Sequence, residues 1–135
     1  MMAQVKALIG NIKGKDGEKG KDGSENQIYS YDETPIGTWV NGKPLYRKII
    51  KTSVNQGVQK IYDVSNMNLD DIIRMDGSIS QSVGSIVHIP YGTGSNDFAV
   101  IYYPKSSNQI EINTTRAGIV NIILEYTKTT DTATT

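Results

Sequence analysis

The chain of 135 residues contains no cysteine, a single histidine and no excess of charge of either sign. Without cysteine, neither a disulfide framework nor a thiolate metal site can form. Basic residues (Lys and Arg) and acidic residues (Asp and Glu) number 14 each. A nucleic acid partner is therefore not expected, because phosphate binding needs a basic excess on one face.

Long apolar runs are also missing. No run reaches the ~18 residues that a membrane-spanning helix requires, and residues 1–12 lack the apolar core of a signal peptide. We therefore expect no membrane insertion. Such a protein can still act outside a cell if it leaves by lysis inside a particle.

What the sequence does contain is a glycine at every third position of GKDGEKGKDG, namely Gly14, Gly17, Gly20 and Gly23. This period suits neither a helix, which each glycine weakens by roughly 1 kcal/mol relative to alanine, nor a strand. A collagen triple helix requires it, because only glycine fits at the crowded axis of three chains. The alternative is a charged flexible linker, since the segment has only three full triplets and no proline.

The segment before these glycines predicts a short helix. Val5, Leu8, Ile9 and Ile12 recur at the i, i+3, i+4, i+7 spacing that makes one apolar stripe. Alone, a helix this short is marginal in water. Either three copies pack along the stripe and start the triple helix, or the stripe anchors the chain on a neighbouring protein. Both interpretations require a partner.

From residue 27 onward the pattern becomes that of β-strands separated by Gly-, Ser- and Asn-rich turns. The predicted strands cover residues 28–31, 36–40, 45–50, 58–64, 72–75, 86–89, 98–103, 109–113 and 119–126. Asn41-Gly42 predicts a type I′ hairpin turn, and Asp76-Gly77 predicts a second turn. Residues 68–75 could instead form one helical turn. Turns at intervals of about ten residues are typical of a β-sandwich or jelly roll.

The chain thus divides into four parts: a short helix (residues 1–12), a collagen-like neck (13–24), a jelly-roll-like β-sandwich head (25–128) and a tail (129–135). The tail is mostly threonine and alanine, and we expect it to fray. The whole is expected to be a homotrimer.

The sequence contains little that indicates a catalytic or metal-binding site. Asp32-Glu33 and Asp70-Asp71 are adjacent pairs, and neighbours on a strand point to opposite faces, so neither pair can flank a glycosidic bond. His88 has no second histidine or cysteine to join it as a transition-metal ligand. The sequence therefore predicts a protein that is not an enzyme and has no cofactor.

A polar loop with aromatic residues at both ends is the better candidate for binding. Loops on a rigid β scaffold often carry binding sites, and an aromatic ring can contact a sugar face. The candidate saccharide-binding residues are His88, Tyr91, Asn96, Asp97, Tyr102 and Tyr103. The alternative is an ordinary exposed hairpin loop. Trp39 is a second candidate contact, although beside a turn its bulk would more simply fix the hairpin against the sheet.

Two stretches resemble a known group of proteins. They are DETPIGTWVNGKPLYRKII at residues 32–50 and LEYTKTTD at residues 124–131. The matching residues of the first are Glu33, Ile36, Gly37, Trp39, Gly42, Lys43, Leu45, Tyr46 and Arg47. Together with the Gly-x-y segment they resemble the C-terminal head region of tail-fibre and baseplate receptor-binding proteins of tailed bacteriophages that infect Gram-positive bacteria.

This resemblance implies a location in the virion, at the tail tip or baseplate, and action at the host cell surface. The implied partners are two further copies of the chain, other baseplate or tail proteins through the N-terminal segment, and host cell-wall polysaccharide. The implied function is attachment by multivalent, non-catalytic binding. The alternative is a purely structural baseplate or tail-fibre module without receptor binding of its own.

Overall fold

Nine β-strands and one 3-10 turn make up the described part of the chain, residues 28–134 of a computed structural model. The strands are β1 (Thr34–Thr38), β2 (Pro44–Val54), β3 (Gly57–Asp63), β4 (Leu69–Ser80), β5 (Ile86–Ile89), β6 (Tyr91–Gly94), β7 (Asp97–Tyr102), β8 (Gln109–Thr114) and β9 (Gly118–Lys128), with the turn η1 (Lys105–Ser107) before β8. No α-helix occurs between residues 28 and 134. The predicted N-terminal helix and glycine neck lie outside the described residues.

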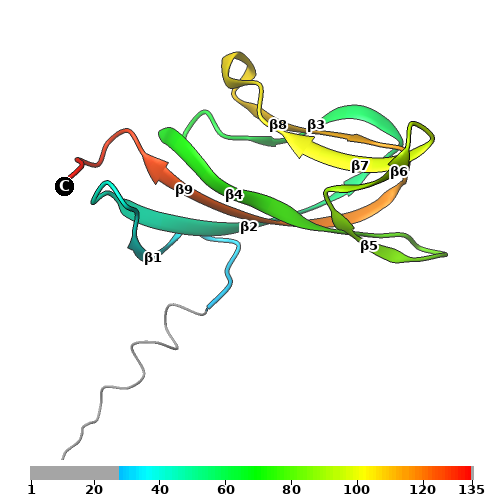
Figure 1. Ribbon diagram of the computed structural model, residues 1–135, viewed down its shortest axis with the longest axis horizontal. Helices are drawn as coiled ribbons and strands as arrows, with labels where there is room; N and C mark the ends of the chain where they lie inside the picture. The colour runs from blue at the N-terminus through cyan, green and yellow to red at the C-terminus, as the bar shows by residue number, and fades with distance from the viewer. Residues whose placement is uncertain (1–27, 135) are drawn as a thin grey trace, which may run out of the picture.

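The strands form two antiparallel sheets that stack as the layers of a sandwich (Figure 1). The five-stranded sheet has the order β1-β2-β9-β4-β5, and the four-stranded sheet has the order β3-β8-β7-β6. The connections β2–β3, β3–β4, β5–β6 and β8–β9 cross between the sheets, and the other four stay within one sheet. The all-β sandwich predicted from the sequence is confirmed.

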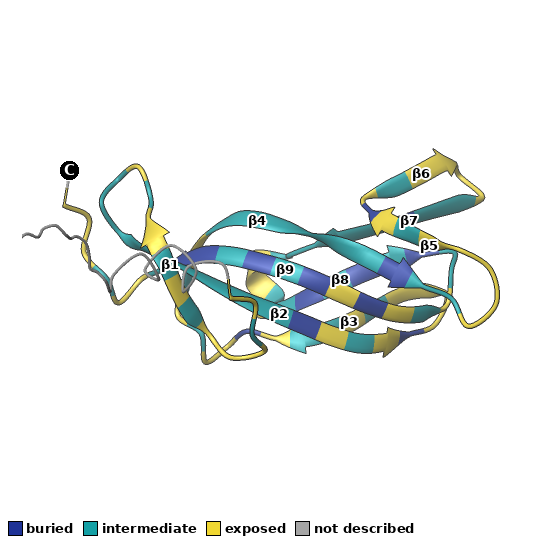
Figure 2. Cartoon of the chain, turned by 90° about the horizontal axis from the view of Figure 1, so that it is seen from below, coloured by how far each residue is buried: buried dark blue, intermediate teal, exposed yellow. Residues whose placement is uncertain are grey.

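The core lies between the sheets and is built from alternate residues of the strands, as the two-residue period of a strand requires. On β9, Val120, Ile122, Leu124 and Tyr126 are all fully buried. The facing sheet contributes residues such as Ile110 and Ile112 of β8, which are also fully buried. Figure 2 shows this alternation along β8 and β9.

The first hairpin forms as predicted, but its turn type is different. Trp39 donates its N–H to the carbonyl of Lys43 (2.8 Å) and accepts from the N–H of Gly42 (2.9 Å). Of the two turn residues, only Gly42 has a positive φ, 86°, so Asn41 does not adopt the left-handed conformation that a type I′ turn needs. Instead, the Asn41 Oδ1 accepts from the N–H of Lys43 (3.0 Å), which stabilises a three-residue loop.

The long strand β4 replaces two predicted features. Asp76-Gly77 is not a turn, and residues 68–75 do not form a helical turn, because β9 pairs with β4 from Leu69 to Ser80. Gly77 permits close approach of the two backbones: a Cβ atom there would lie 1.8 Å from the carbonyl oxygen of Asn121. Gly77 is therefore needed because the backbones of β4 and β9 lie close together there, and not because the chain turns.

The predicted strand at residues 28–31 is wrong, since this segment adopts no regular strand. It nevertheless lies beside β2, where the Ser30 carbonyl accepts a hydrogen bond from the N–H of Ile49 (2.9 Å). The tail after Lys128, for which the sequence predicts fraying, makes defined contacts. The Thr134 N–H donates to the carbonyl of Asn41 (3.0 Å), and the Tyr46 hydroxyl donates to Asp131 (2.7 Å).

The two stretches that carry the family resemblance meet in one cluster at this end of the sandwich. The rings of Tyr46 and Tyr126 stack with their centroids 5.9 Å apart. The Tyr126 hydroxyl donates to Glu33, and Lys128 pairs with the same carboxylate at 2.9 Å. The hydrogen bond to Asp131 raises the pKa of Tyr46 to about 12. The opening hairpin and the closing strand therefore depend on each other structurally.

Replacing Gly77 with alanine should destabilise the fold by about 3 kcal/mol, because the new methyl group overlaps the backbone of β9. Gly92→Ala is the matched control, since its Cβ would meet nothing closer than the Cβ of Phe98 at 3.8 Å. Urea unfolding of both variants measures the difference. Equal midpoints would show that β4 and β9 do not approach as described.

Candidate functional site

A cleft opens in the side of the sandwich, where one strand of each sheet runs on without a neighbour on its outer side within residues 28–134. β5 pairs with β4 only from Gly77 to Ser80, so the first half of β4 is an open edge. β6 pairs with β7 only from Asp97 to Ala99, so the end of β7 is open as well. Between these two edges lies a cavity of about 660 Å³.

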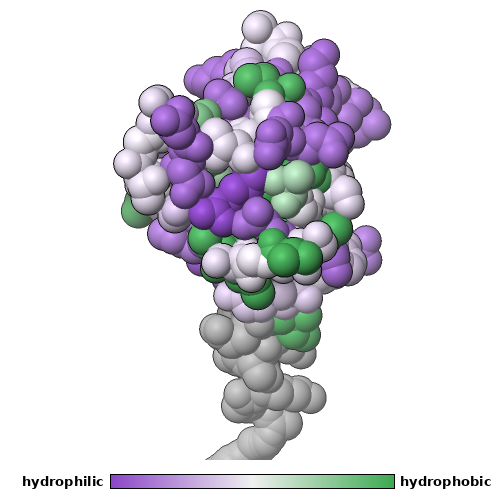
Figure 3. Space-filling model, turned by 90° about the vertical axis from the view of Figure 1, so that its right-hand side faces the viewer, coloured by the Kyte–Doolittle hydropathy of each residue, from purple (hydrophilic) through white to green (hydrophobic). Residues whose placement is uncertain are grey.

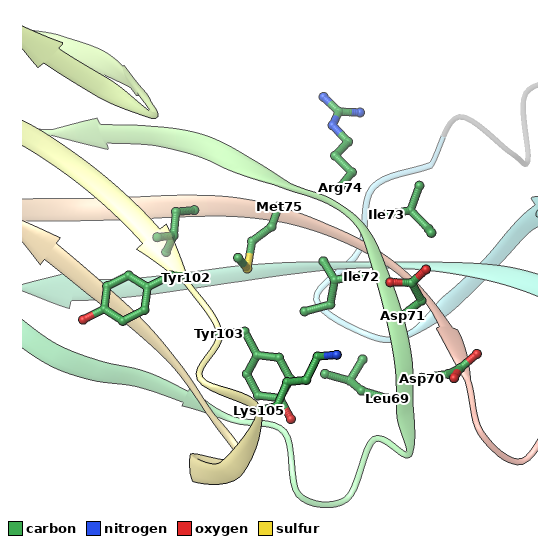
Figure 4. Close-up of a pocket in the computed structure, with 11 residues that line it drawn as sticks. Leu69, Asp70, Asp71, Ile72, Ile73, Arg74, Met75, Tyr102, Tyr103 and Lys105 are labelled. Atoms are coloured by element: carbon green, nitrogen blue, oxygen red, sulfur yellow. The ribbon is translucent and has the colours of Figure 1, made fainter.

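The floor of the cleft is apolar and its mouth is charged. The lining residues are Leu69, Asp70, Asp71, Ile72, Ile73, Arg74, Met75, Ile101, Tyr102, Tyr103 and Lys105. Figure 4 shows Leu69, Ile72, Met75 and Tyr103 pointing into the space between β4 and β7, with Arg74 pointing away from it. The four inward side chains also pack against the buried core, which holds their positions.

Some of the charged side chains at the mouth already have partners within the protein, and others do not. Asp70 accepts from Lys43 (2.7 Å) and from the hydroxyl of Thr127 (3.1 Å). The hydrogen bond from Lys43 lowers the pKa of Asp70. Asp71 and Lys105 form no ion pair within residues 28–134. An acid and a base are therefore left available to a ligand at the mouth of the cleft.

Of the residues predicted from the sequence, Tyr102 and Tyr103 reach this cleft, but in different ways. Tyr103 packs inward with Met75 and Ile72. Tyr102 faces the outside of the four-stranded sheet, where it is paired in register with Glu111. Burial and a hydrogen bond to Glu111 raise the pKa of Tyr102. Tyr102 thus borders the cleft, while its ring lies on the outer face of the four-stranded sheet.

Tyr91 and Asp97 come together at the other end of the molecule, around Arg116. Arg116 donates to both carboxylate oxygens of Asp97, from Nε at 3.0 Å and from Nη2 at 3.2 Å. The Tyr91 hydroxyl donates to Asp97 (2.9 Å) and accepts from Arg116 (3.2 Å), and the guanidinium lies 4.8 Å from the Tyr91 ring centroid. A further bond joins Arg116 to Gln81. This cluster ties the β6–β7 hairpin to the β8–β9 connection.

The other candidates lie elsewhere. Asn96 is exposed at the tip between β6 and β7. His88 is exposed on the outer face of the five-stranded sheet, between the inward residues Val87 and Ile89. Trp39 is half-buried at the first hairpin turn and is not part of the core cluster. The six candidate residues therefore do not form a single site.

Sequence reasoning missed the β4 wall of the cleft, including Met75, Ile72 and Leu69. These residues fit a buried strand equally well, and only the shortness of β5 leaves them at an opening. For Lys105 the sequence gives one weak indication of a place in the site: it follows directly after the strand end at Tyr102-Tyr103-Pro104.

Comparison with known proteins adds no assignment: no family model, curated protein or solved structure matches this chain significantly. Within residues 28–134, His, Asp and Glu side chains do not gather in threes in a way that could hold a metal ion. A helix capable of crossing a membrane is likewise absent from that range.

The Arg116 cluster makes stability depend on pH. The hydrogen bonds from Arg116 and Tyr91 hold the pKa of Asp97 below its ordinary value of 3.8. The carboxylate thus stabilises the fold above that value, and the contribution disappears as the pH falls through the folded-state pKa. Asp97→Asn should lower the urea midpoint at pH 7, and the gap from the wild type should shrink toward about pH 3.

Asn96→Ala is the control, because this neighbouring side chain is exposed and should leave the midpoint unchanged at both pH values. An Asp97→Asn gap that stays constant between the two pH values would contradict the ion pair described here.

Proposed function

We propose that this chain is the receptor-binding head of a phage tail fibre or baseplate, and that it attaches the virion to host cell-wall saccharides without catalysis. The observation that carries the proposal is the cleft of about 660 Å³ between β4 and β7, with the Tyr103 ring on its wall and Lys105 at its mouth. A concave site with an apolar floor and a few polar groups suits a small ligand. The resemblance of residues 32–50 and 124–131 to phage head regions supports the same function.

The chemistry of the lining fits a sugar ring. The C–H face of a pyranose can pack on Tyr103 and Met75, while the tyrosine hydroxyl can bond a sugar hydroxyl. The two open strand edges add backbone N–H and C=O groups that, within residues 28–134, have no neighbouring strand on that side. Lys105 and Asp71 can bind a charged substituent or further hydroxyls. All of these are binding interactions, and none requires a reaction at the sugar.

Assembly into a trimer would raise the avidity with which the protein attaches to the cell wall. We infer a homotrimer, held by the collagen-like neck at residues 13–24 and carrying a jelly-roll-like head on each chain. A single shallow sugar site binds weakly, but several sites acting together can raise avidity by roughly 10² to 10⁴. The N-terminal segment would join the trimer to other tail or baseplate proteins in the virion.

Neighbouring tyrosines allow a sharp test of the site. Tyr103→Ala should weaken binding of host wall polysaccharide by roughly 3- to 10-fold per site, because it removes an aromatic contact from the cleft. Tyr102→Ala should weaken binding clearly less than Tyr103→Ala does, since Tyr102 borders the cleft but its ring faces the outside of the four-stranded sheet. Isothermal titration with polysaccharide fragments, normalised to folded protein, measures both.

Lys105→Ala provides a second variant that should not disturb folding, because the side chain is exposed and forms no ion pair within residues 28–134. It should lower affinity as Tyr103→Ala does. If Tyr102→Ala alone loses binding, the site lies on the outer face of the four-stranded sheet. If the wild type docks to a baseplate but binds no wall saccharide, the chain is the structural module that we considered as the alternative.

A further inference from the structure

Large hydrophobic side chains are exposed next to one another at residues 28–31, where the described chain enters the head. Ile28, Tyr29 and Tyr31 are 55%, 53% and 59% exposed. Tyr29, Ser30, Tyr31 and Ile49 line a shallow hollow of about 420 Å³. A second hollow of about 390 Å³ adjoins it along β2 and shares Tyr31 and Ile49. Figure 3 shows hydrophobic surface at the edge of the head where the described chain begins.

This segment is held firmly in place, so the exposure is not that of a loose end. The N–H of Ile49 donates to the Ser30 carbonyl at 2.9 Å, and the Lys48 ammonium donates to the carbonyl of Tyr31. The Arg47 guanidinium lies 4.3 Å from the Tyr29 ring centroid. Arg47 is itself fixed by Glu125 at 2.9 Å. The backbone is thus bound to β2 while the apolar side chains face outward.

The collagen-like neck predicted from the sequence would place copies of this chain close to that surface. The last glycine of the Gly-x-y series is Gly23, five residues before Ile28. An extended chain spans at most about 3.6 Å per residue, so Ile28 lies within roughly 18 Å of the end of the glycine series. If three chains share an axis at Gly23, their three copies of residues 28–31 must lie near one another.

We propose that residues 28–31 and Ile49 form the contact between the three heads, with Ile28 of one copy seated in the hollow beside Tyr31 and Ile49 of the next. The inference rests on the trimeric neck included in the proposed function. In a three-fold ring, one surface of each copy contacts a different surface of the next copy, and three such contacts close the ring. An apolar side chain meeting an apolar hollow satisfies this requirement. The contact also fixes the orientation of each head relative to the neck.

The absence of cysteine from the chain makes a clean test possible, since any introduced cysteine is the sole thiol. The full-length variants Ile28→Cys and Tyr31→Cys are unfolded together and refolded as a mixture, so that trimers carry thiols on both sides of the proposed contact, then oxidised under mild conditions and run on a non-reducing gel. Val83→Cys is the matched control, because Val83 is also an exposed apolar residue, at 87%, but belongs to the distant β4–β5 connection.

The Ile28→Cys and Tyr31→Cys mixture should form a covalent dimer at least fivefold faster than Val83→Cys, with at most two of every three chains joined because a trimer offers three thiols. A wild type that is monomeric by light scattering would overturn the proposal. So would a trimer in which the mixture of Ile28→Cys and Tyr31→Cys cross-links no faster than Val83→Cys. Saccharide titration of the same wild-type preparation reports separately on the proposed function, so the two can fail independently.

Discussion

Burial of every second side chain of β9 is the interaction on which the rest of the structure depends. Val120, Ile122, Leu124 and Tyr126 are fully buried, and each contributes about 1.5–3 kcal/mol relative to an exposed position. Because β9 lies between β2 and β4, it aligns both strands by its own hydrogen bonds. The last of these residues, Tyr126, also connects the core to the cluster formed by Tyr46 and Glu33.

The position of the cleft follows from this arrangement. β9 supports β4 over its whole length, so β4 can extend beyond the short strand β5 without losing its place in the sheet. In the opposite sheet, β8 likewise supports β7 where β7 extends beyond the end of its pairing with β6. An opening bounded by two well-supported strands keeps its shape while leaving backbone and side chains accessible. By contrast, the polar groups of Tyr91 and Asp97 in the β6–β7 hairpin already bond to Arg116, which suits a structural role.

The sequence predicted the fold class and seven of the strand positions well, because alternation of apolar and polar residues reports directly on which face is buried. It predicted β4 poorly: Asp76-Gly77 has the composition of a turn, and only pairing with Asn121 and its neighbours in β9 shows why glycine is needed. Tyr103 was identified as a candidate from its aromatic character. Met75 was not, since its role depends on where another strand ends, which no local pattern reports.

Methyl-resolved NMR of the full-length protein tests the central claim most directly, because the cleft contains Leu69, Ile72, Met75 and Ile101 as probes. Titration with fragments of host wall polysaccharide should shift these four methyl signals together and saturably. The methyl signals of Val83 and Ile86, on the distant hairpin, should stay in place. Shifts confined to residues outside the cleft, or no shift at saturating fragment, would contradict the assignment of saccharide binding to this site.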